Sequence, residues 1–196
     1  VADRLYQLPL GLIGIAVGVA MLPRLSRLVQ EGDAAGARGA LDEAVALSMA
    51  FTLPAAAAIL AMPEYLLEGL YTRGAFTVQD ANNAAMALIH YGWGVPAFVL
   101  AKIYAPAFFA REDTRGPMRY AITSMILNVV FGAALFFGLR SIGVAGFPGL
   151  AIATSTAAWL NVLLMIRALV KQGAYGPTPA AFGRLLRIVL ASAILF

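Results

Sequence analysis

Side chains that could do chemistry are few in this chain, and they stand apart from one another. Arg4 follows Asp3 at the head of the first apolar stretch, and Lys102 lies inside a later one. Such charges are candidates for function, because an arginine at the centre of a membrane helix costs about 2.5–3.5 kcal/mol. One histidine, no cysteine and no clustered carboxylates leave no set of metal ligands. We therefore predict no metal, no cofactor and no enzyme activity.

The depth of Arg4 in a membrane decides what it can do. From Arg4 to Arg24 the chain rises about 30 Å as a helix, which is the thickness of a bilayer core. This spacing places Arg4 near the rim, where an arginine anchors a helix by extending its charge to the headgroups. Asp3 is adjacent, and adjacent residues do not face each other on a helix. The two residues either bracket a polar cavity or mark the interface.

The other polar residues of the apolar stretches have simpler interpretations. Lys102 either extends to the membrane surface or lines a cavity, and both interpretations stay open. His90, beside Tyr91 and Trp93, is typical of the aromatic belt at a membrane interface. A further set is typical of hydrogen bonds between helices: Asn82, Asn83, Ser124, Asn128, Asn161 and Thr154-Ser155-Thr156.

The elements that must position these residues are apolar stretches of membrane-spanning length. The chain has 196 residues, of which 61% are hydrophobic and 12% charged, with a mean hydropathy of +0.82. A bilayer core requires about 20 apolar residues per helix. We predict an all-α fold, a polytopic transmembrane helix bundle of about five full spans plus a truncated sixth, forming one lobe over residues 1–196. The spans are 5–23, 44–63, 81–110, 120–139, 144–166 and the truncated 184–196.

Local patterns add detail to these spans. Gly14 and Gly18 predict close packing of the first helix against a neighbour. Pro54 predicts a kink in the second span. The third span is too long for a straight crossing and contains Gly92, Gly94, Pro96 and Pro106, so we predict a broken or strongly tilted helix. Residues 24–43 are amphipathic and are predicted to lie on the membrane surface.

Basic residues predict the orientation. The loops 24–43, 111–119 and 167–187 hold nearly all of them, namely Arg24, Arg27, Arg38, Arg111, Arg115, Arg119, Arg167, Lys171, Arg184 and Arg187. The intervening loops hold only Arg73 and Arg140. Cytoplasmic loops are rich in Lys and Arg, so these three loops are predicted to be cytoplasmic, with Val1 at the outer side. The net charge of +4 belongs to these loops and does not indicate nucleic-acid binding. Because Met is absent at the start and the sixth span is short, we interpret the chain as a piece of a longer protein.

Three stretches carry a resemblance to a known family: residues 2–16 (ADRLYQLPLGLIGIA), 70–77 (LYTRGAFT) and 102–117 (KIYAPAFFAREDTRGP). In that order they resemble the MurJ/MviN lipid II flippases of the multidrug/oligosaccharidyl-lipid/polysaccharide exporter superfamily. The resemblance covers nearly the whole chain, and its third stretch is the most specific. It implies that the chain is the second lobe of a two-lobe transporter whose first lobe is absent here.

The resemblance implies a substrate and a site. The substrate is lipid II, an undecaprenyl-diphosphate carrying the peptidoglycan precursor, moved by alternating access to the outer leaflet of the bacterial plasma membrane for cell wall synthesis. Arg4 matches the family's cavity arginine, so it is expected to bind the diphosphate, with Asp3 orienting or gating it and Lys102 as a further cavity candidate. The family's sodium site has an aspartate one turn after an asparagine, whereas Gly132 follows Asn128 here, and we predict no such site.

Other functions remain open from the residues. A related exporter of other undecaprenyl-diphosphate glycans, or a cation-coupled drug antiporter, would use the same architecture. A non-transporting membrane scaffold for wall-synthesis enzymes is the alternative from another class. The expected partners are lipid II and membrane lipids, with wall-synthesis proteins added in the scaffold case.

Overall fold

The computed structural model describes residues 2–72, 76–176 and 179–194, and every regular element in these ranges is helical. The remaining residues, which include Arg73 of the second predicted loop, lie outside the described part. The elements are α1 (Ala2–Pro9), the π-helix η1 (Leu10–Ile15), α2 (Ala16–Gln30), α3 (Ala34–Ala61), α4 (Pro63–Tyr71), α5 (Val78–Gly92), α6 (Val95–Phe109), α7 (Arg115–Ser141), α8 (Phe147–Lys171) and α9 (Pro179–Ile194). The predicted all-α class is confirmed. Among the described residues, four helices are long and apolar enough to cross a membrane, or up to five if the bent pair α5–α6 counts as one span.

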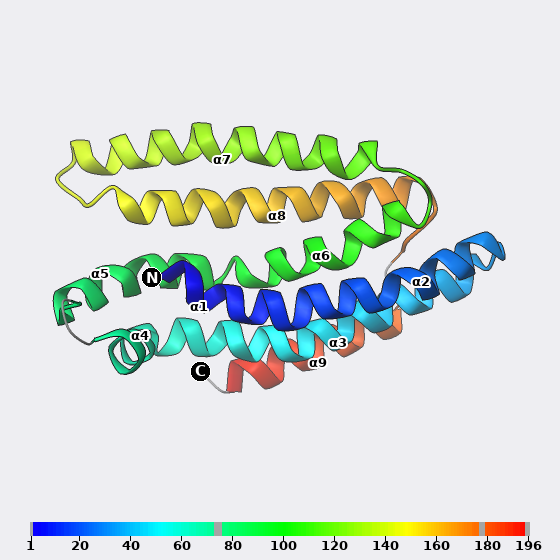
Figure 1. Cartoon of the computed structure of the whole chain (residues 1–196), viewed down its shortest axis with the longest axis horizontal. Coiled ribbons are helices and arrows are strands. Elements are labelled where there is room, and N and C mark those ends of the chain that lie inside the picture. The colour runs from blue at the N-terminus through cyan, green and yellow to red at the C-terminus, as the bar shows by residue number, and fades with distance from the viewer. Residues whose placement is uncertain (1, 73–75, 177–178, 195–196) are drawn as a thin grey trace.

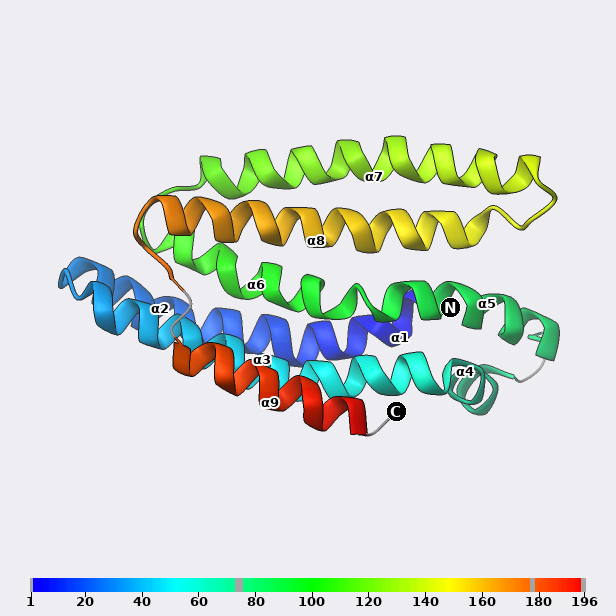
Figure 2. The same ribbon diagram turned by 180° about the vertical axis from the view of Figure 1, so that it is seen from behind.

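The helices form layers on either side of α6. The antiparallel pair α7–α8 lies on one side, while α2, α3 and α9 lie on the other (Figure 1). Figure 2 shows from behind that α9 lies along α3 and away from α8. Most of α6 is buried, and Val95, Ile103 and Phe108 have no exposed surface. The central helix is therefore the element on which both layers pack.

The first span is the continuous run α1, η1 and α2, which packs closely on α6. A Cβ added at Gly18 would lie 2.5 Å from the carbonyl oxygen of Lys102, and one at Gly14 would lie 3.4 Å from Cα of Val99. Only glycine lets two backbones approach this closely. The predicted close packing of this glycine pair is confirmed. The π-helical turn η1, by contrast, was not predicted.

The third predicted span is broken, as the glycines and proline indicated. α5 and α6 meet at an angle of 45° across Trp93 and Gly94. Pro96 stands in the first turn of α6, where its missing N–H leaves no helical bond unmade. We call this bend the elbow. In the second span, Pro54 lies inside α3, which runs as one helix from Ala34 to Ala61.

The prediction that residues 24–43 lie on the membrane surface is wrong. Arg24 to Gln30 continue α2, and α3 begins at Ala34 after a tight turn in which Gly32 has a φ of +73°. The apolar face of this segment is covered by the partner helix of the hairpin, since Leu25 is 1% exposed and Leu41 is 2% exposed. An amphipathic pattern shows only that one face is covered, and here protein covers it.

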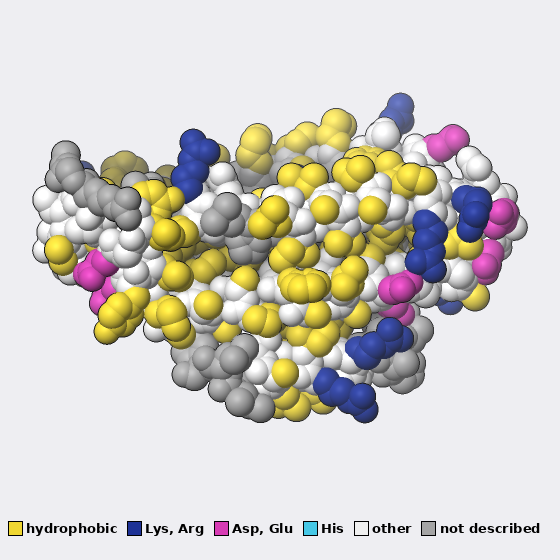
Figure 3. All heavy atoms as spheres, turned by 60° about the horizontal axis from the view of Figure 1, so that its bottom comes forward, with side chains coloured by type: hydrophobic (Ala, Val, Ile, Leu, Met, Phe, Trp, Pro, Cys, Tyr) yellow, Lys and Arg dark blue, Asp and Glu magenta, His cyan; other side chains and the backbone are white. Residues whose placement is uncertain are grey.

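One end of the bundle, the basic end, contains the turns α2–α3 and α6–α7 and the connection α8–α9. Figure 3 shows one face on which most Lys and Arg side chains gather toward this end, while hydrophobic side chains cover the middle. Large exposed apolar residues such as Phe51, Val129 and Phe137 lie on the outside of the helices. This distribution is that of a bundle with lipid around its waist.

At the basic end a strap, residues 172–176, follows α8 and leads toward α9. Arg38 Nη2 donates to the carbonyl of Gly173 at 2.6 Å, and Arg111 Nη2 donates to that of Ala174 at 3.4 Å. Arg111 also donates through Nη1 to Ala107 at 2.7 Å, and partial burial lowers the pKa of its guanidinium from the ordinary value. These arginines satisfy carbonyls that follow helix ends, where no helical N–H is available.

Tyr175 fixes the strap to the interior. It is 6% exposed, its ring meets that of Tyr104 edge-on at 5.5 Å, and the two hydroxyls are 3.5 Å apart. Its phenol also hydrogen-bonds to the carboxylate of Asp42 on α3. Burial, with smaller contributions from Tyr104 and Asp42, raises the pKa of Tyr175 well above its usual value. The strap thus ties α3, α6 and α8 together.

Candidate functional site

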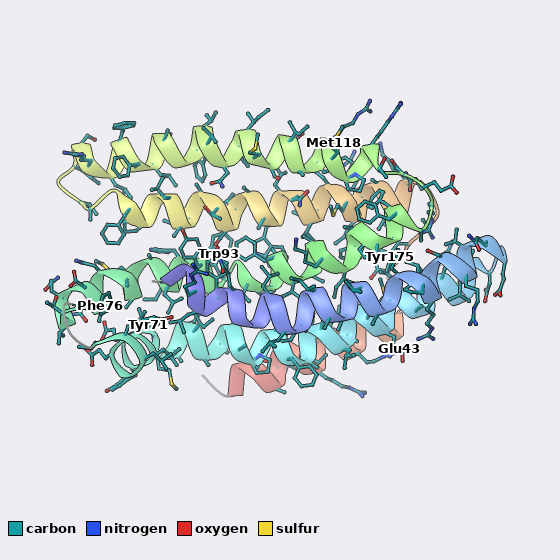
Figure 4. All side chains as sticks on the ribbon, in the orientation of Figure 1. Glu43, Tyr71, Phe76, Trp93, Met118 and Tyr175 are labelled. Carbon is teal, nitrogen blue, oxygen red and sulfur yellow. The ribbon has the colours of Figure 1, made fainter. Side chains whose placement is uncertain are left out.

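The elbow frees backbone carbonyls that need partners, and α8 supplies them. Ser155 Oγ donates to the carbonyl of His90 at 2.7 Å, and Trp159 Nε1 donates to the carbonyl of Trp93 at 3.0 Å. Ser155 and Trp159 are one turn apart on α8 and so share a face. Figure 4 shows Trp93 where α5 meets α6, close to α8. The interhelical hydrogen bond predicted for Ser155 is confirmed, while the interfacial role of His90 stays a prediction.

Beyond the elbow, the ammonium-bearing residue Lys102 lines a cavity of about 380 Å³, the Lys102 pocket. The lining comes from four elements, namely Leu10 of η1, Phe98, Ala101 and Lys102 of α6, Ala121, Ser124, Met125 and Asn128 of α7, and Thr154, Ala157, Ala158 and Asn161 of α8. Lys102 is exposed and forms no ion pair with the side chains the structure describes. Of its two sequence interpretations, the structure favours the cavity-lining one.

Polar groups of this pocket differ in how they are satisfied. Thr154 Oγ1 lies 2.9 Å from its own-helix acceptor, the carbonyl of Leu150, and 3.3 Å from Asn128 Oδ1 across the helix pair. Ser124 donates to the carbonyl of Ala121. Asn161 Oδ1 is buried without a hydrogen-bond partner in the described part of the chain. Lys102 and Asn161 therefore keep hydrogen-bonding capacity for a polar occupant. Asn128 and Thr154 are confirmed as an interhelical pair.

Arg4 lies on α1, which packs beside the part of α5 nearest the elbow. Leu5 is buried, and the ring of Tyr6 packs on Tyr91 and Phe98 at 4.8 and 5.2 Å. Tyr91 is about 20 Å along α5 from its first residue, so Arg4 does not stand level with the beginning of that helix. The start of α1 also lies inside the end of the bundle formed by α5 and the α7–α8 turn (Figure 1).

The exposed guanidinium of Arg4 forms no ion pair with any side chain the structure describes. The side chain of Asp3 lies outside the described part, so its orientation relative to Arg4 stays a prediction. The prediction that Arg4 lies at the rim assumed that the first span ends at Arg24, on the opposite membrane surface. In the structure α2 continues about 9 Å further, to Gln30. The recessed placement removes the argument for the rim, and a cavity-facing role of Arg4 stays a prediction.

The structure does not bring Arg4 and Lys102 into one site. Gly14 contacts Lys102, since a Cβ there would lie 3.6 Å from Lys102 Cβ, and Gly14 is about 15 Å along the helix from Arg4. This separation exceeds the length of one diphosphate group. Leu10, at the edge of the Lys102 pocket, is only about 9 Å from Arg4. Arg4 on α1 and Lys102 on α6 are therefore two separate cations, at successive positions along the length of the first span.

Trp159, Tyr175 and Asp42 were not singled out from the sequence. Trp159, like Ser155, is a donor whose acceptor appears only once the elbow is formed. Tyr175 stands between Gly173 and Gly176 in a polar loop, and an aromatic residue in such a loop is the one signal that pointed to it. Pairing of Asp42 with this distant tyrosine has no local signature.

A bundle of long apolar helices, with one broken span and a lysine in a partly polar pocket beside the break, is typical of a lobe of a membrane transporter. This chain belongs to the MurJ family: it matches the family model described as "Lipid II flippase MurJ" over residues 1–196. The resemblance found in the three motifs is confirmed. The family consists of transporters of the bacterial inner membrane.

Individual relatives agree. The chain is 41% identical over 194 residues to the "Probable lipid II flippase MurJ" of Rhizobium meliloti (strain 1021), covering 99% of the chain and 35% of that relative. It is 35% identical to the protein of the same description from Vibrio cholerae, covering 99% and 36%. A solved structure, "Lipid II flippase MurJ, inward closed conformation", matches with a TM-score of 0.80 at 25% identity, covering 98% of this chain and 38% of that one. The chain thus spans about a third of the length of the relatives it matches.

Proposed function

We propose that this chain is a lobe of a transporter that moves lipid II from the inner to the outer leaflet of the bacterial inner membrane, by alternating access, for cell wall synthesis. The family match over the whole chain supports the substrate class. The observation that carries the site is the recessed, exposed Arg4, which forms no ion pair with the described side chains. Arg4 binds the diphosphate, Asp3 orients or gates it, and Lys102 receives polar groups in its pocket.

Physical chemistry supports such a site. A diphosphate cannot enter hydrocarbon unpaired, because burial of an isolated charge costs far more than lipid contacts return. A guanidinium forms strong, charge-assisted bonds to phosphate oxygens. Outward movement of an anion is also favoured in an inside-negative cell by about 2.3 kcal/mol per charge per 100 mV. A binding site with cations beside a partly polar pocket is therefore suited to a diphosphate headgroup.

The proposed orientation places the basic end in the cytoplasm. The basic end carries the arginines of the α2–α3 hairpin and the α6–α7 turn, and the basic residues of α8 and α9 that flank the strap, and Lys and Arg concentrate in cytoplasmic loops. The beginning of α1, with Arg4, then faces the outer half of the membrane. Accessibility of single cysteines at Arg38 and Arg140 to a membrane-impermeant thiol reagent tests this orientation, with Arg140 expected to react from outside.

Substitution of Arg4 tests the function. In the chromosomal gene, Arg4→Ala should reduce appearance of lipid II in the outer leaflet by more than tenfold, and Arg4→Lys should retain part of it. Arg140→Ala, at an exposed arginine in the last turn of α7, is the control and should leave transport unchanged. Equal transport by Arg4→Ala and Arg140→Ala at equal protein levels would contradict the assignment.

A binding competition separates the remaining transport alternatives. Purified protein should bind lipid II more tightly than undecaprenyl-diphosphate bearing other glycans. Equal affinities would favour the broader exporter of lipid-linked sugars. A scaffold would tolerate Arg4→Ala and lose function only when surface residues are changed.

A further inference from the structure

The elbow between α5 and α6 is held from outside by α8. A break in a helix leaves carbonyl groups without their helical donors. At the elbow, the carbonyl of His90 receives the hydroxyl of Ser155 and that of Trp93 receives the indole N–H of Trp159, at 2.7 and 3.0 Å. Ser155 has no exposed surface. Both bonds are at least partly buried, and an unmade bond at a buried group is costly.

Close packing of Gly94 against α8 holds the elbow independently of these hydrogen bonds. A Cβ added there would overlap the Ser155 hydroxyl and lie 2.7 Å from Ser155 Cβ. The elbow backbone therefore approaches α8 as closely as glycine allows. Because hydrogen bonds and steric contact act on the same few residues, this elbow has little freedom to change its angle.

The angle of the elbow determines where Lys102 lies. Lys102 is about 12 Å along α6 from Gly94, so a 10° change in the bend would move it by about 2 Å. The facing wall of its pocket, Ala157, Ala158 and Asn161, belongs to the same α8 that holds the elbow. One helix thus sets both the position of the cation and the shape of the cavity around it.

The first span would be displaced by any movement of α6. Gly18 packs on the carbonyl oxygen of Lys102, so a displacement of α6 would push against the helix that carries Arg4. Backbone contact of this kind has no flexible side chain to absorb a shift.

We infer that Ser155 and Trp159 are positioning residues that hold the elbow at a fixed angle, so that it is a rigid corner and not a hinge of the transporter. This inference rests on the proposed function only for its transport readout. Broken helices in transporters lend themselves to hinge motion, and here the side chains of α8 prevent it. Any change of access must then occur elsewhere in the protein.

The distance between two spin labels, measured by electron paramagnetic resonance, reports the angle between α5 and α6. The chain has no cysteine, so labels at Gln79 and Phe109, near the outer ends of α5 and α6, report the elbow. Helical rise and the 45° bend place these positions about 41 Å apart. In the whole protein, in lipid, we expect one narrow distance that shifts by less than about 1 Å when lipid II is added. A shift above about 2 Å, or two populations, would overturn the inference, because that corresponds to about 15° of bending.

Variants test the two residues. Ser155→Ala with Trp159→Phe should broaden the distance distribution and slow transport about tenfold, with lipid II affinity changed less than twofold. Thr156→Val is the matched control, because its hydroxyl donates only to its own helix at Ile152, and it should leave both readouts unchanged. An unaltered distance distribution in the double variant also refutes the inference. If the wild-type protein moves no lipid II, the proposed function fails, while the distance measurement still decides whether the elbow is rigid.

Discussion

Replacement of Gly18 by alanine tests the backbone contact between the first span and α6. The new Cβ would stand 2.5 Å from the Lys102 carbonyl oxygen and 3.4 Å from its carbonyl carbon. Real Cβ atoms need more than 3 Å, so the two helices must separate by more than half an ångström. Overpacking of this kind typically costs about 1–3 kcal/mol. Alanine also favours the helix over glycine by about 1 kcal/mol, so the raw change alone is not informative.

Gly11 offers a matched control on the same span. A Cβ there meets nothing within 4 Å, so Gly11→Ala gains helix propensity without a clash. The difference between the two variants removes the shared propensity gain and isolates the packing contact. We expect Gly18→Ala to be less stable than Gly11→Ala by about 1–3 kcal/mol.

Unfolding of the whole protein by SDS in mixed micelles, followed by tryptophan fluorescence, measures this difference. Equal free energies of unfolding for the two variants, or greater stability of Gly18→Ala, would refute the reasoning. A third variant, Gly18→Ser, should behave like Gly18→Ala because its Cβ meets the same oxygen. Transport should fall in the same order, since the contact links the helix of Arg4 to that of Lys102.

Three further predictions concern the strap, an ion pair and the pocket. Tyr175→Phe removes the phenol that bonds Asp42 and should cost about 1–3 kcal/mol of unfolding free energy. Because the pKa of Tyr175 is raised in the folded state, its contribution is fully present below pH about 10, the pKa of an unfolded tyrosine, and is lost as the pH rises further; unfolding followed from pH 8 to 11 should show a decline that Tyr175→Phe lessens. Arg24→Gln breaks the 2.9 Å pair with Glu43, whose side chains are 57% and 62% exposed, and a double-mutant cycle should give less than about 1 kcal/mol. Lys102→Ala should weaken lipid II binding less than Arg4→Ala does, as measured by titration, and an equal loss would place both cations on one phosphate group.

Features set by local pattern were predictable. The length of the apolar stretches predicts the helices, and Gly92, Gly94 and Pro96 predict the elbow because each disfavours a continuous helix there. The pair Gly14 and Gly18 predicts a close approach. In each case the residue type itself restricts the backbone, whatever the rest of the chain does.

Features set by partners distant in the chain were not predictable. The amphipathic residues 24–43 reveal a covered face but not whether lipid or protein covers it. The hydroxyl of Ser155 and the indole of Trp159 are visible in the sequence, whereas the carbonyls they bond depend on where the elbow forms. The depth of Arg4 depends on how far α2 extends beyond Arg24, which helix propensity leaves open.

The strap also constrains how the lobe is assembled. α3 and α9 lie side by side, although α4 to α8 are synthesised between them. Arg38 and Asp42 on α3 therefore gain their contacts with Gly173 and Tyr175 only after α8 has been synthesised. The basic end closes by joining a helix made early to a segment made late, so a nascent lobe without the strap differs at this end from one that contains it.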